Sequence, residues 1–420
     1  MSSQNQRPVS KRGAATIFYL LALGSGMFRT FSVGFDLVAL NTIANEPIIY
    51  GFLSQWVSFA VTFTVVVLLS VRVSRNGTKK QALGYSLDPD FGRISLLPKK
   101  PMMYLVVAGI FAGISTFFYY FIVGYTDASA VLPYGQLVII YLLIGDLWSE
   151  KDTPTIIELQ CIISILIGVL LVGVEPGGFD IPTLIIVLVP MNISSSLVTY
   201  YQRKTKRYEI KPGLKVDSLN MRIWTLLVLN TIMSVMMIPL LPANAIELMM
   251  IFIGPFFWFM VGSSLATFLA LVFYVRALGK GAMSIVNSLS AISVVLGIPM
   301  TLIGNAIVPG AFGTISTDMF LWILKIFGVI LVMIGVISLQ ASDVRSIVII
   351  NVKQLTGDLL PVFFDIKGVE SAAALAGSHD YLLSIKSRSL GKTRENILKK
   401  IQAIPEVKSI ETMVVLRDYV

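Results

Sequence analysis

The sequence predicts an all-α polytopic membrane protein with ten transmembrane helices, followed by a small α+β domain of the ferredoxin-like βαββαβ order. Three observations support this fold class: long apolar runs, a one-sided distribution of basic residues, and a change of composition after Gln340. Of the 420 residues, 55% are hydrophobic and only 14% are charged. Because soluble domains usually contain about 25% charged residues, the composition alone indicates a chain that meets lipid.

The apolar runs reach about 20 residues, the length that crosses the hydrocarbon core as a helix. They are continuous, whereas a closed barrel would show alternating polar and apolar residues. We therefore expect helical spans at 14–35, 48–71, 102–124, 128–147, 156–174, 181–201, 222–241, 250–275, 282–304 and 319–340.

Lysine and arginine give an independent test of these spans. If the N-terminus is cytoplasmic, every basic residue before position 281 except Arg29 lies in a predicted inner segment, and acidic residues such as Asp36 and Glu46 lie in outer loops. Basic loops stay on the cytoplasmic side of a membrane. We expect a multi-pass protein of a prokaryotic plasma membrane with both termini cytoplasmic. Its net charge of +9 then reflects topology and contacts with anionic lipid, not binding of nucleic acid.

Enzymatic signatures are missing from the sequence. The single cysteine, Cys161, falls inside a predicted span, and the single histidine is His379. This leaves neither a disulfide framework nor a cysteine metal site. No Walker loop or nucleophile-elbow motif is present. We expect no enzyme, no cofactor and no metal, and the long first apolar run is unlike a cleavable signal peptide.

The C-terminal segment alternates strand and helix patterns. We expect strands at 345–353, 368–376, 381–387 and 407–416, and helices at 357–367 and 392–403. This order predicts one sheet with two helices on a single face. About 75 residues bury a marginal core, so dimerisation is a natural way to bury more surface.

Two similar segments suggest an internal repeat in the helical part. Residues 121–137 and 274–290 fall at the third-to-fourth and eighth-to-ninth helix junctions. Five spans in each half invert the second half relative to the first, which builds an alternating-access site near the midplane. The predicted parts are an N-terminal tail (1–13), two five-helix repeats (14–175 and 181–341) and a C-terminal domain (345–420).

Charged and polar residues inside the spans are the candidate site. Arg29 and Lys325 lie within apolar spans, where a charge costs roughly 2.5–3.5 kcal/mol. The functional interpretation is that each contacts an anionic group of the substrate. The structural alternative for Arg29 is that it pairs with Asp36 or extends its charged end to the membrane surface. The structural alternative for Lys325 is that it extends its charged end to the outer surface. The fourth span holds Tyr134 and Gln136 next to a proline, and the ninth holds Asn287. Such clusters either meet a solute or only allow close helix packing.

The helical part resembles the EamA-type drug/metabolite transporters, mainly over 118–150 and 274–304. That family has a glycine–glutamate signature after the fourth helix of each repeat. Gly145-Asp146, Glu150 and Gly304-Asn305 match it inexactly. The resemblance implies a central cavity formed by the first, third, fourth, sixth, eighth and ninth helices. The residues it implies for that cavity are Arg29, Tyr119, Tyr134, Gln136, Asn192 and Asn287.

The C-terminal segment is similar to the effector-binding domain of Lrp/AsnC regulators, without their DNA-binding helix-turn-helix. The similarity rests on Gly368-Val369, on 377–381 (GSHDY) and on 404–407 (IPEV). It implies a domain that dimerises and binds small molecules, often amino acids, near Gly377, His379 and Asp380. The alternative is that Asp380 only caps its turn.

Taken together, the patterns favour a secondary transporter of small polar or amphipathic metabolites, with amino acids favoured. A cytoplasmic small-molecule-binding domain would regulate it and pair two copies as a homodimer. The other partners expected are the substrate and membrane lipid. The alternative is a membrane-anchored small-molecule receptor through which nothing crosses.

Overall fold

The computed structural model describes residues 11–73, 81–123, 128–148, 156–174, 181–312, 318–341, 344–353, 357–366, 368–387 and 397–414. The chain forms two compact units. The helical unit contains residues 15–153 and 160–336. The C-terminal unit contains residues 337–420, with 1–14 and 154–159.

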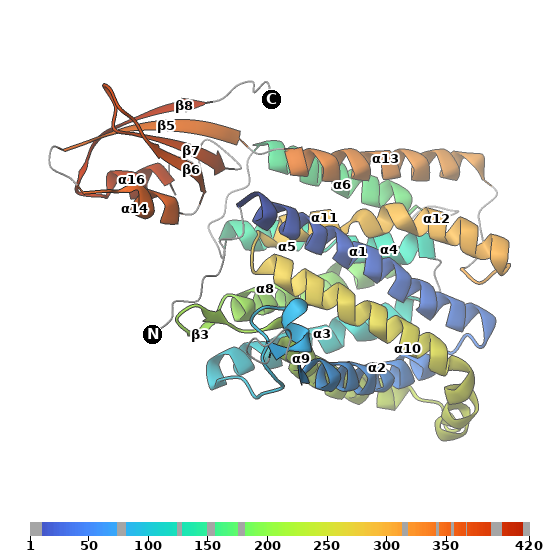
Figure 1. Ribbon diagram of the computed structural model, residues 1–420. Coiled ribbons are helices and arrows are strands. Elements are labelled where there is room, and N and C mark those ends of the chain that lie inside the picture. Colours follow the sequence, from blue (N-terminus) through green and yellow to red (C-terminus); the bar gives the residue numbers. More distant parts are fainter. Residues whose placement is uncertain are drawn as a thin grey trace. The chain divides into compact units, whose positions relative to one another are not determined.

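Helices make up the helical unit almost entirely (Figure 1). In its first half they are α1 (Lys11–Thr42), α2 (Pro47–Leu69), α3 (Lys99–Val123), α4 (Ala128–Gln136), α5 (Ile139–Trp148) and α6 (Ile156–Val172). In its second half they are α7 (Ile181–Ile186), the π-helical segment η2 (Val187–Ile193), α8 (Ser194–Lys206), α9 (Ser218–Met237), α10 (Ala245–Leu278), α11 (Met283–Ser290), α12 (Ile292–Ile307) and α13 (Met319–Ala341). Short connecting elements are β1 (Arg72–Val73), β2 (Gln81–Ala82), η1 (Leu83–Ser86), β3 (Glu209–Lys211), β4 (Leu214–Lys215) and η3 (Ile238–Leu240).

Many of these helices are apolar enough to cross a membrane. Among the described residues, eight have the length and composition of a membrane span, and the apolar helices Leu132–Asp146 and Leu159–Val172 are shorter. They indicate a membrane-embedded protein, since about 20 apolar residues cross the hydrocarbon. Every expected span overlaps one or more helices. The count of ten crossings and the repeat stay predictions, because the two shorter helices fall below the usual length.

Several helices are interrupted near the middle of the unit. Pro133 precedes the turn at Leu137 and Val138 that separates α4 from α5, and Pro190 lies in the π-helical segment η2. Proline has no N–H to donate and clashes with the preceding turn, so it breaks or widens a helix. A second break, at Ala291, separates α11 from α12, and there the Ser290 hydroxyl donates to the carbonyl of Asn287. Such breaks bring backbone polar groups into the interior.

The first helix continues further than its hydropathy suggested. The expected span ended at residue 35 and placed Asp36 in an outer loop, but α1 continues to Thr42. Asp36 is only 3% exposed. One carboxylate lowered the local hydropathy although apolar Leu37 to Leu40 continue the helix. The placement of Asp36 in a loop was therefore wrong.

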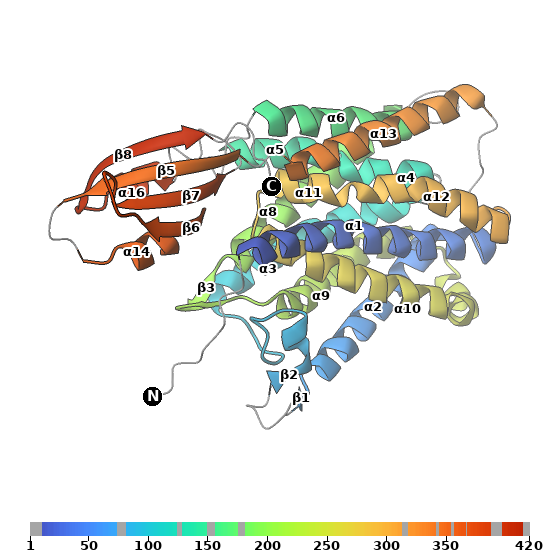
Figure 2. The ribbon, with the colours of Figure 1, turned by 45° about the horizontal axis from the view of Figure 1, so that its top comes forward.

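Close backbone approach joins α6 to α13, which lie side by side in Figures 1 and 2. A Cβ atom added to Gly168 would lie 2.5 Å from the carbonyl oxygen of Gly328, and the reverse distance is 2.6 Å. Glycine is the residue that permits such contact between membrane helices. These two positions therefore require glycine for packing.

The C-terminal unit contains a four-stranded antiparallel sheet in the order β6-β7-β5-β8. Its elements are β5 (Val344–Val352), α14 (Leu360–Asp365), β6 (Val369–Ala374), β7 (Tyr381–Ser387), α16 (Lys399–Gln402) and β8 (Val407–Val414). Figure 1 shows α14 and α16 on one face of the sheet. Val348, Leu383, Phe363 and Ile401 are buried between them. This is the expected ferredoxin-like order, and residues 392–396 of the expected second helix lie outside the described residues.

Candidate functional site

A cavity of about 250 Å³ lies inside the helical unit. Side chains of α1, α2, α3, α8, α9, α10 and α11 line it, together with Met191 of η2 and with Gly135 and Val138 at the break between α4 and α5. Most of its wall residues are polar: hydroxyl, amide and charged groups. Polar groups inside membrane helices are expensive and usually mark a solute path. A concave site with convergent polar groups is the general form of a small-molecule site.

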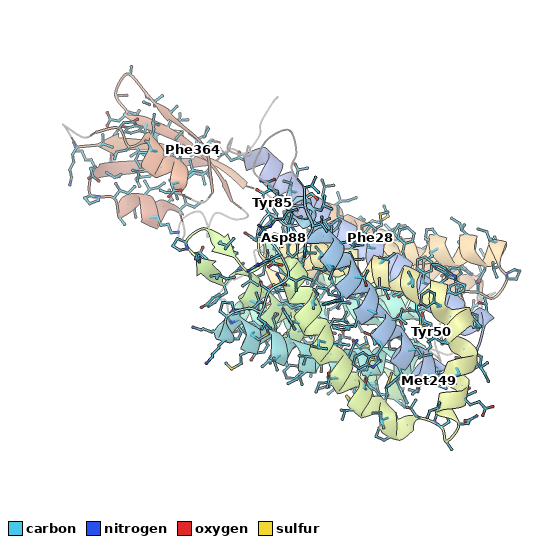
Figure 3. All side chains as sticks on the ribbon, turned by 60° about the horizontal axis from the view of Figure 1, so that its bottom comes forward. Phe28, Tyr50, Tyr85, Asp88, Met249 and Phe364 are labelled. Carbon is cyan, nitrogen blue, oxygen red and sulfur yellow. The ribbon has the colours of Figure 1, made fainter. Side chains whose placement is uncertain are left out.

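Asp36 forms an acidic part of the cavity wall. Tyr50 donates a hydrogen bond of 2.8 Å to its Oδ1 atom, and Tyr119 donates one of 3.1 Å to its Oδ2 atom. Tyr50 lies in the first turn of α2, and Figure 3 shows it well apart from Asp88, which comes just after η1 in the segment that follows α2. Asp36 and its hydroxyl donors therefore lie toward the end of the unit where α2 begins.

Arg29 is open to the cavity near the middle of α1. Within the described part of the chain it makes no ion pair and no hydrogen bond. In particular, it does not pair with Asp36, which was the structural alternative. Its guanidinium packs against Gly135, where an added Cβ atom would lie 2.8 Å from the Arg29 Nη2 atom. The charge is thus left available to a solute.

Four polar side chains form a chain of three hydrogen bonds that connects the two interrupted spans. The Tyr274 hydroxyl donates to Asn287 Oδ1 at 3.4 Å, and Asn287 Nδ2 donates to Gln136 Oε1 at 3.0 Å. Gln136 Nε2 in turn donates to the Ser293 hydroxyl at 3.1 Å. Tyr274 and Asn287 line the cavity, whereas Gln136 lies behind them. The chain of bonds links α4, beside the first break, to α11 and α12 on either side of the second.

The remaining predicted site residues lie elsewhere. Asn192 is fully buried and donates from Nδ2 to the backbone carbonyl of Tyr134 at 2.9 Å. Lys325 is buried in α13. None of these three belongs to the cavity wall. Of the seven predicted substrate-binding residues, the structure brings Arg29, Tyr119 and Asn287 to the cavity; their binding of a substrate stays a prediction.

Two wall helices were missing from the predicted set. The second span contributes Ser54, Gln55 and Ser58, and the seventh contributes Arg222 and Thr225. The available signal was the spacing of small polar residues, since Ser54 and Ser58 are four apart and share one helix face. Arg222 was expected only as a cytoplasmic basic residue.

Buried ion pairs join the helices at the end where α8 finishes. Arg203 Nη1 lies 2.9 Å from Asp146 Oδ1, with 2% and 1% of the two side chains exposed. Asp146 also accepts hydrogen bonds from the backbone N–H groups of Met283 and Ser284. The acid of the expected glycine–glutamate signature therefore holds the start of α11, while Glu150 lies outside the described residues.

A second buried cluster surrounds Lys206, whose Nζ lies 2.9 Å from Asp88 and 3.0 Å from Asp90. Burial opposes ionisation of Asp88, but the charge and hydrogen bond of Lys206 outweigh it and leave the pKa of this carboxyl below its ordinary value. Burial raises the pKa of nearby Asp217 to about 6, against the hydrogen bonds from Asn220. Lys206 and Arg203 therefore serve packing as well as topology.

In the C-terminal unit, the predicted ligand turn is tied to the sheet. Asp380 Oδ2 accepts a hydrogen bond of 2.7 Å from the Val352 N–H, and His379 Nδ1 lies 3.1 Å from Asn351 Oδ1. Gly377 is exposed, and its φ of +153° is one that L side chains rarely adopt. Asp380 thus has the structural role of joining the turn to β5, and its binding of a ligand stays a prediction.

The face of this sheet opposite the helices carries apolar side chains. Ile347 pairs with Met413, and Ile349 pairs with Leu382, on neighbouring strands. They alternate with the core residues Val348 and Leu383, so they lie on the other face. Met413 is 48% exposed. This open face is a surface that a second copy could cover.

Comparison with known proteins assigns the C-terminal part. Residues 362–420 match the family model of the Lrp/AsnC ligand binding domain. The resemblance of the helical part to EamA-type transporters has no such match and stays a prediction. A solved structure described as "Crystal structure of protein" aligns with 77% of this chain and 96% of its own, at a TM-score of 0.49 and 14% sequence identity. A comparison with curated proteins gave no match.

Proposed function

We propose that the protein is a secondary transporter of small polar or amphipathic metabolites, with amino acids favoured, under the control of its C-terminal ligand-binding domain. The observation that carries this proposal is the polar cavity inside apolar helices, with Arg29 open to it and without an ion-pair partner among the described residues. Helices that only attach a domain to the membrane do not need such a cavity, and each polar group inside a membrane costs free energy.

The interrupted helices support transport by alternating access. The breaks between α4 and α5 and between α11 and α12 occur in the fourth and ninth spans, which correspond if the two halves are inverted repeats. Discontinuous helices near the midplane are typical of transporter sites. In this proposal the shorter helices complete ten crossings, and the two repeats rock around the cavity.

The C-terminal domain supplies the regulation and the preference for amino acids. Lrp/AsnC ligand binding domains match residues 362–420, and the resemblance to that family implies small ligands such as amino acids. The open face of the sheet favours a homodimer, since it would bury Ile347, Ile349 and Met413. The protein would lie in a prokaryotic plasma membrane with this domain in the cytoplasm.

Reconstitution of the full chain in proteoliposomes tests the proposal. We expect gradient-dependent uptake or efflux of labelled amino acids, lost in Arg29→Ala, because an alanine methyl group cannot bind a carboxylate. Arg29→Lys keeps the charge but not the planar fork, so it should retain partial activity. Arg93→Ala, which removes an exposed arginine of the same unit, is the matched control.

Two results would count against this view. Normal transport by Arg29→Ala would show that Arg29 is structural. If the wild-type chain moved no metabolite in either direction but still bound one, the alternative of a membrane-anchored small-molecule receptor would be favoured.

A further inference from the structure

Arg222 is a buried cation, and none of the described residues forms an ion pair with it. It lies four residues after the start of α9, is 7% exposed and lines the cavity. Within the described parts of the chain it forms no ion pair and no hydrogen bond, and its Nε atom is buried without a partner. A buried guanidinium without compensation is strongly unfavourable. Its position in the cavity wall therefore points to an anion that binds there.

The charged residues of the cavity wall occupy different positions along the helices. Arg222 lies near the start of α9, the end where α2 finishes and Asp88 is found, while Arg29 lies near the middle of α1. Asp36 follows Arg29 by seven residues, about 10 Å along a helix. Asp36 already accepts two hydrogen bonds from Tyr50 and Tyr119.

Among the described residues, the wall therefore carries two cationic side chains, Arg29 and Arg222, and a single acidic one, Asp36. Asp36 is the sole acidic residue that the described chain contributes to this wall. Long helical side chains lean toward the N-terminus of their helix. Arg29 thus leans toward the end where Arg222 lies and away from Asp36. The same wall also offers neutral donors and acceptors such as Gln202, Thr199 and Thr225.

We propose that the substrate carries two carboxylate groups, one bound by Arg29 and the other by Arg222. Arginine is well suited to this, because its planar guanidinium binds a carboxylate through two parallel hydrogen bonds. This inference rests on the proposed function, in which amino acids are favoured, and it narrows that class to the acidic amino acids. Arg222 is then the residue that distinguishes a dicarboxylic amino acid from its amide.

L-Glutamate and L-glutamine are the two probes, because they have nearly the same size and differ by one carboxylate. Both are offered to the reconstituted full chain, and equilibrium binding is measured on the same preparations. We expect the wild type to prefer glutamate over glutamine by at least about tenfold, the usual effect of one charge-assisted hydrogen bond. Arg222→Gln should lose this preference by weakening glutamate and leaving glutamine nearly unchanged.

Two further variants separate direct contact from general electrostatics. Arg222→Lys keeps the charge and should retain part of the glutamate preference. Arg93→Gln removes one exposed positive charge next to Asn220, which binds the Arg93 backbone carbonyl. It should leave the preference intact. Binding that persists unchanged in Arg222→Gln belongs to another site, such as the C-terminal domain.

The proposal fails if the wild type handles glutamine as well as glutamate, or neither of them. It also fails if Arg222→Gln weakens both ligands equally. If the protein transports neutral amino acids and substitution of Arg222 has no effect, this inference is wrong but the proposed transport function holds. If glutamate binds in an Arg222-dependent way but is not transported, the inference holds and the proposed transport function is wrong. Because the wild-type preference is measured first, a poorly folded variant does not leave the question open.

Discussion

Removal of Asp146 should destabilise the helical unit more than removal of any exposed acid. This carboxylate receives a hydrogen bond from Arg203 at 2.9 Å and backbone hydrogen bonds from Met283 at 3.1 Å and Ser284 at 2.7 Å. Asp146→Ala leaves the guanidinium, which is 2% exposed, without this anion, and both backbone N–H groups lose their acceptor. The helix start of α11 loses its negative partner as well.

The magnitude follows from the burial of the pair. Breaking a buried ion pair by removing one partner costs roughly 3–5 kcal/mol, because the other charge stays buried. Two unsatisfied N–H groups act in the same direction, each at about 1–3 kcal/mol, although these costs overlap. We therefore expect Asp146→Ala to lower the free energy of unfolding by at least about 3 kcal/mol.

The double variant Asp146→Ala/Arg203→Met distinguishes this mechanism from simple loss of packing. It removes the stranded charge, so it should be more stable than Asp146→Ala alone. Stability is measured in detergent by thermal unfolding of the four members of the cycle. Glu209→Ala is the control, because the Glu209 side chain is exposed in the same unit and exposed charges contribute only about 0–1 kcal/mol. Additive losses in the cycle would refute the reasoning.

Three other outcomes can be measured. Cysteines placed at Ser3 and Asp418 of a cysteine-free chain should resist an impermeant reagent in intact cells, since both termini are predicted to be cytoplasmic; labelling of either would overturn the topology. Asp380→Ala should abolish ligand-dependent pairing of the full chain, and deletion of 345–420 should remove the ligand response; a response that survives deletion contradicts regulation by the tail. The pKa of Asp88 lies below its ordinary 3.8, so its ionised form stabilises the fold above that pH; the stability lost in Asp88→Asn should be constant near neutrality and shrink below about pH 4, and a loss that grows with acidification would exclude this origin.

Helix positions were predictable from the sequence because continuous apolar runs have few other folds in lipid. The ends of the helices were harder to predict. Hydropathy averages over neighbours, so one acidic residue inside a span resembles the beginning of a loop, and Asp36 was placed outside α1 for this reason. The C-terminal fold followed from residue alternation, and β5 occupies nearly the residues expected for it.

The kinds of residue that line the cavity could be predicted from the sequence better than their positions. Arg29 and Asn287 were found because charged and amide groups are rare in spans. Asn192 is also an amide, yet its side chain donates to the backbone carbonyl of Tyr134 in the helix packing. Which face of a helix meets the interior depends on long-range packing, and this is not visible in one sequence. Arg222 was counted only as a cytoplasmic basic residue, because a basic residue at the end of a span can mark topology and also line a cavity.

The bonds from Tyr274 to Ser293 have one further consequence, which concerns how the sequence can change. Each amide in this chain donates on one side and accepts on the other: Asn287 accepts from Tyr274 and donates to Gln136, which donates to Ser293. Turning Asn287 alone would set oxygen against oxygen, and turning Gln136 alone would set N–H against N–H, so the two amides must keep one orientation relative to each other. The two halves of the helical unit cannot then drift independently at these sites. Among descendants of this sequence, a lineage that replaces Gln136 should also replace Asn287, and the pair should be inherited as one character.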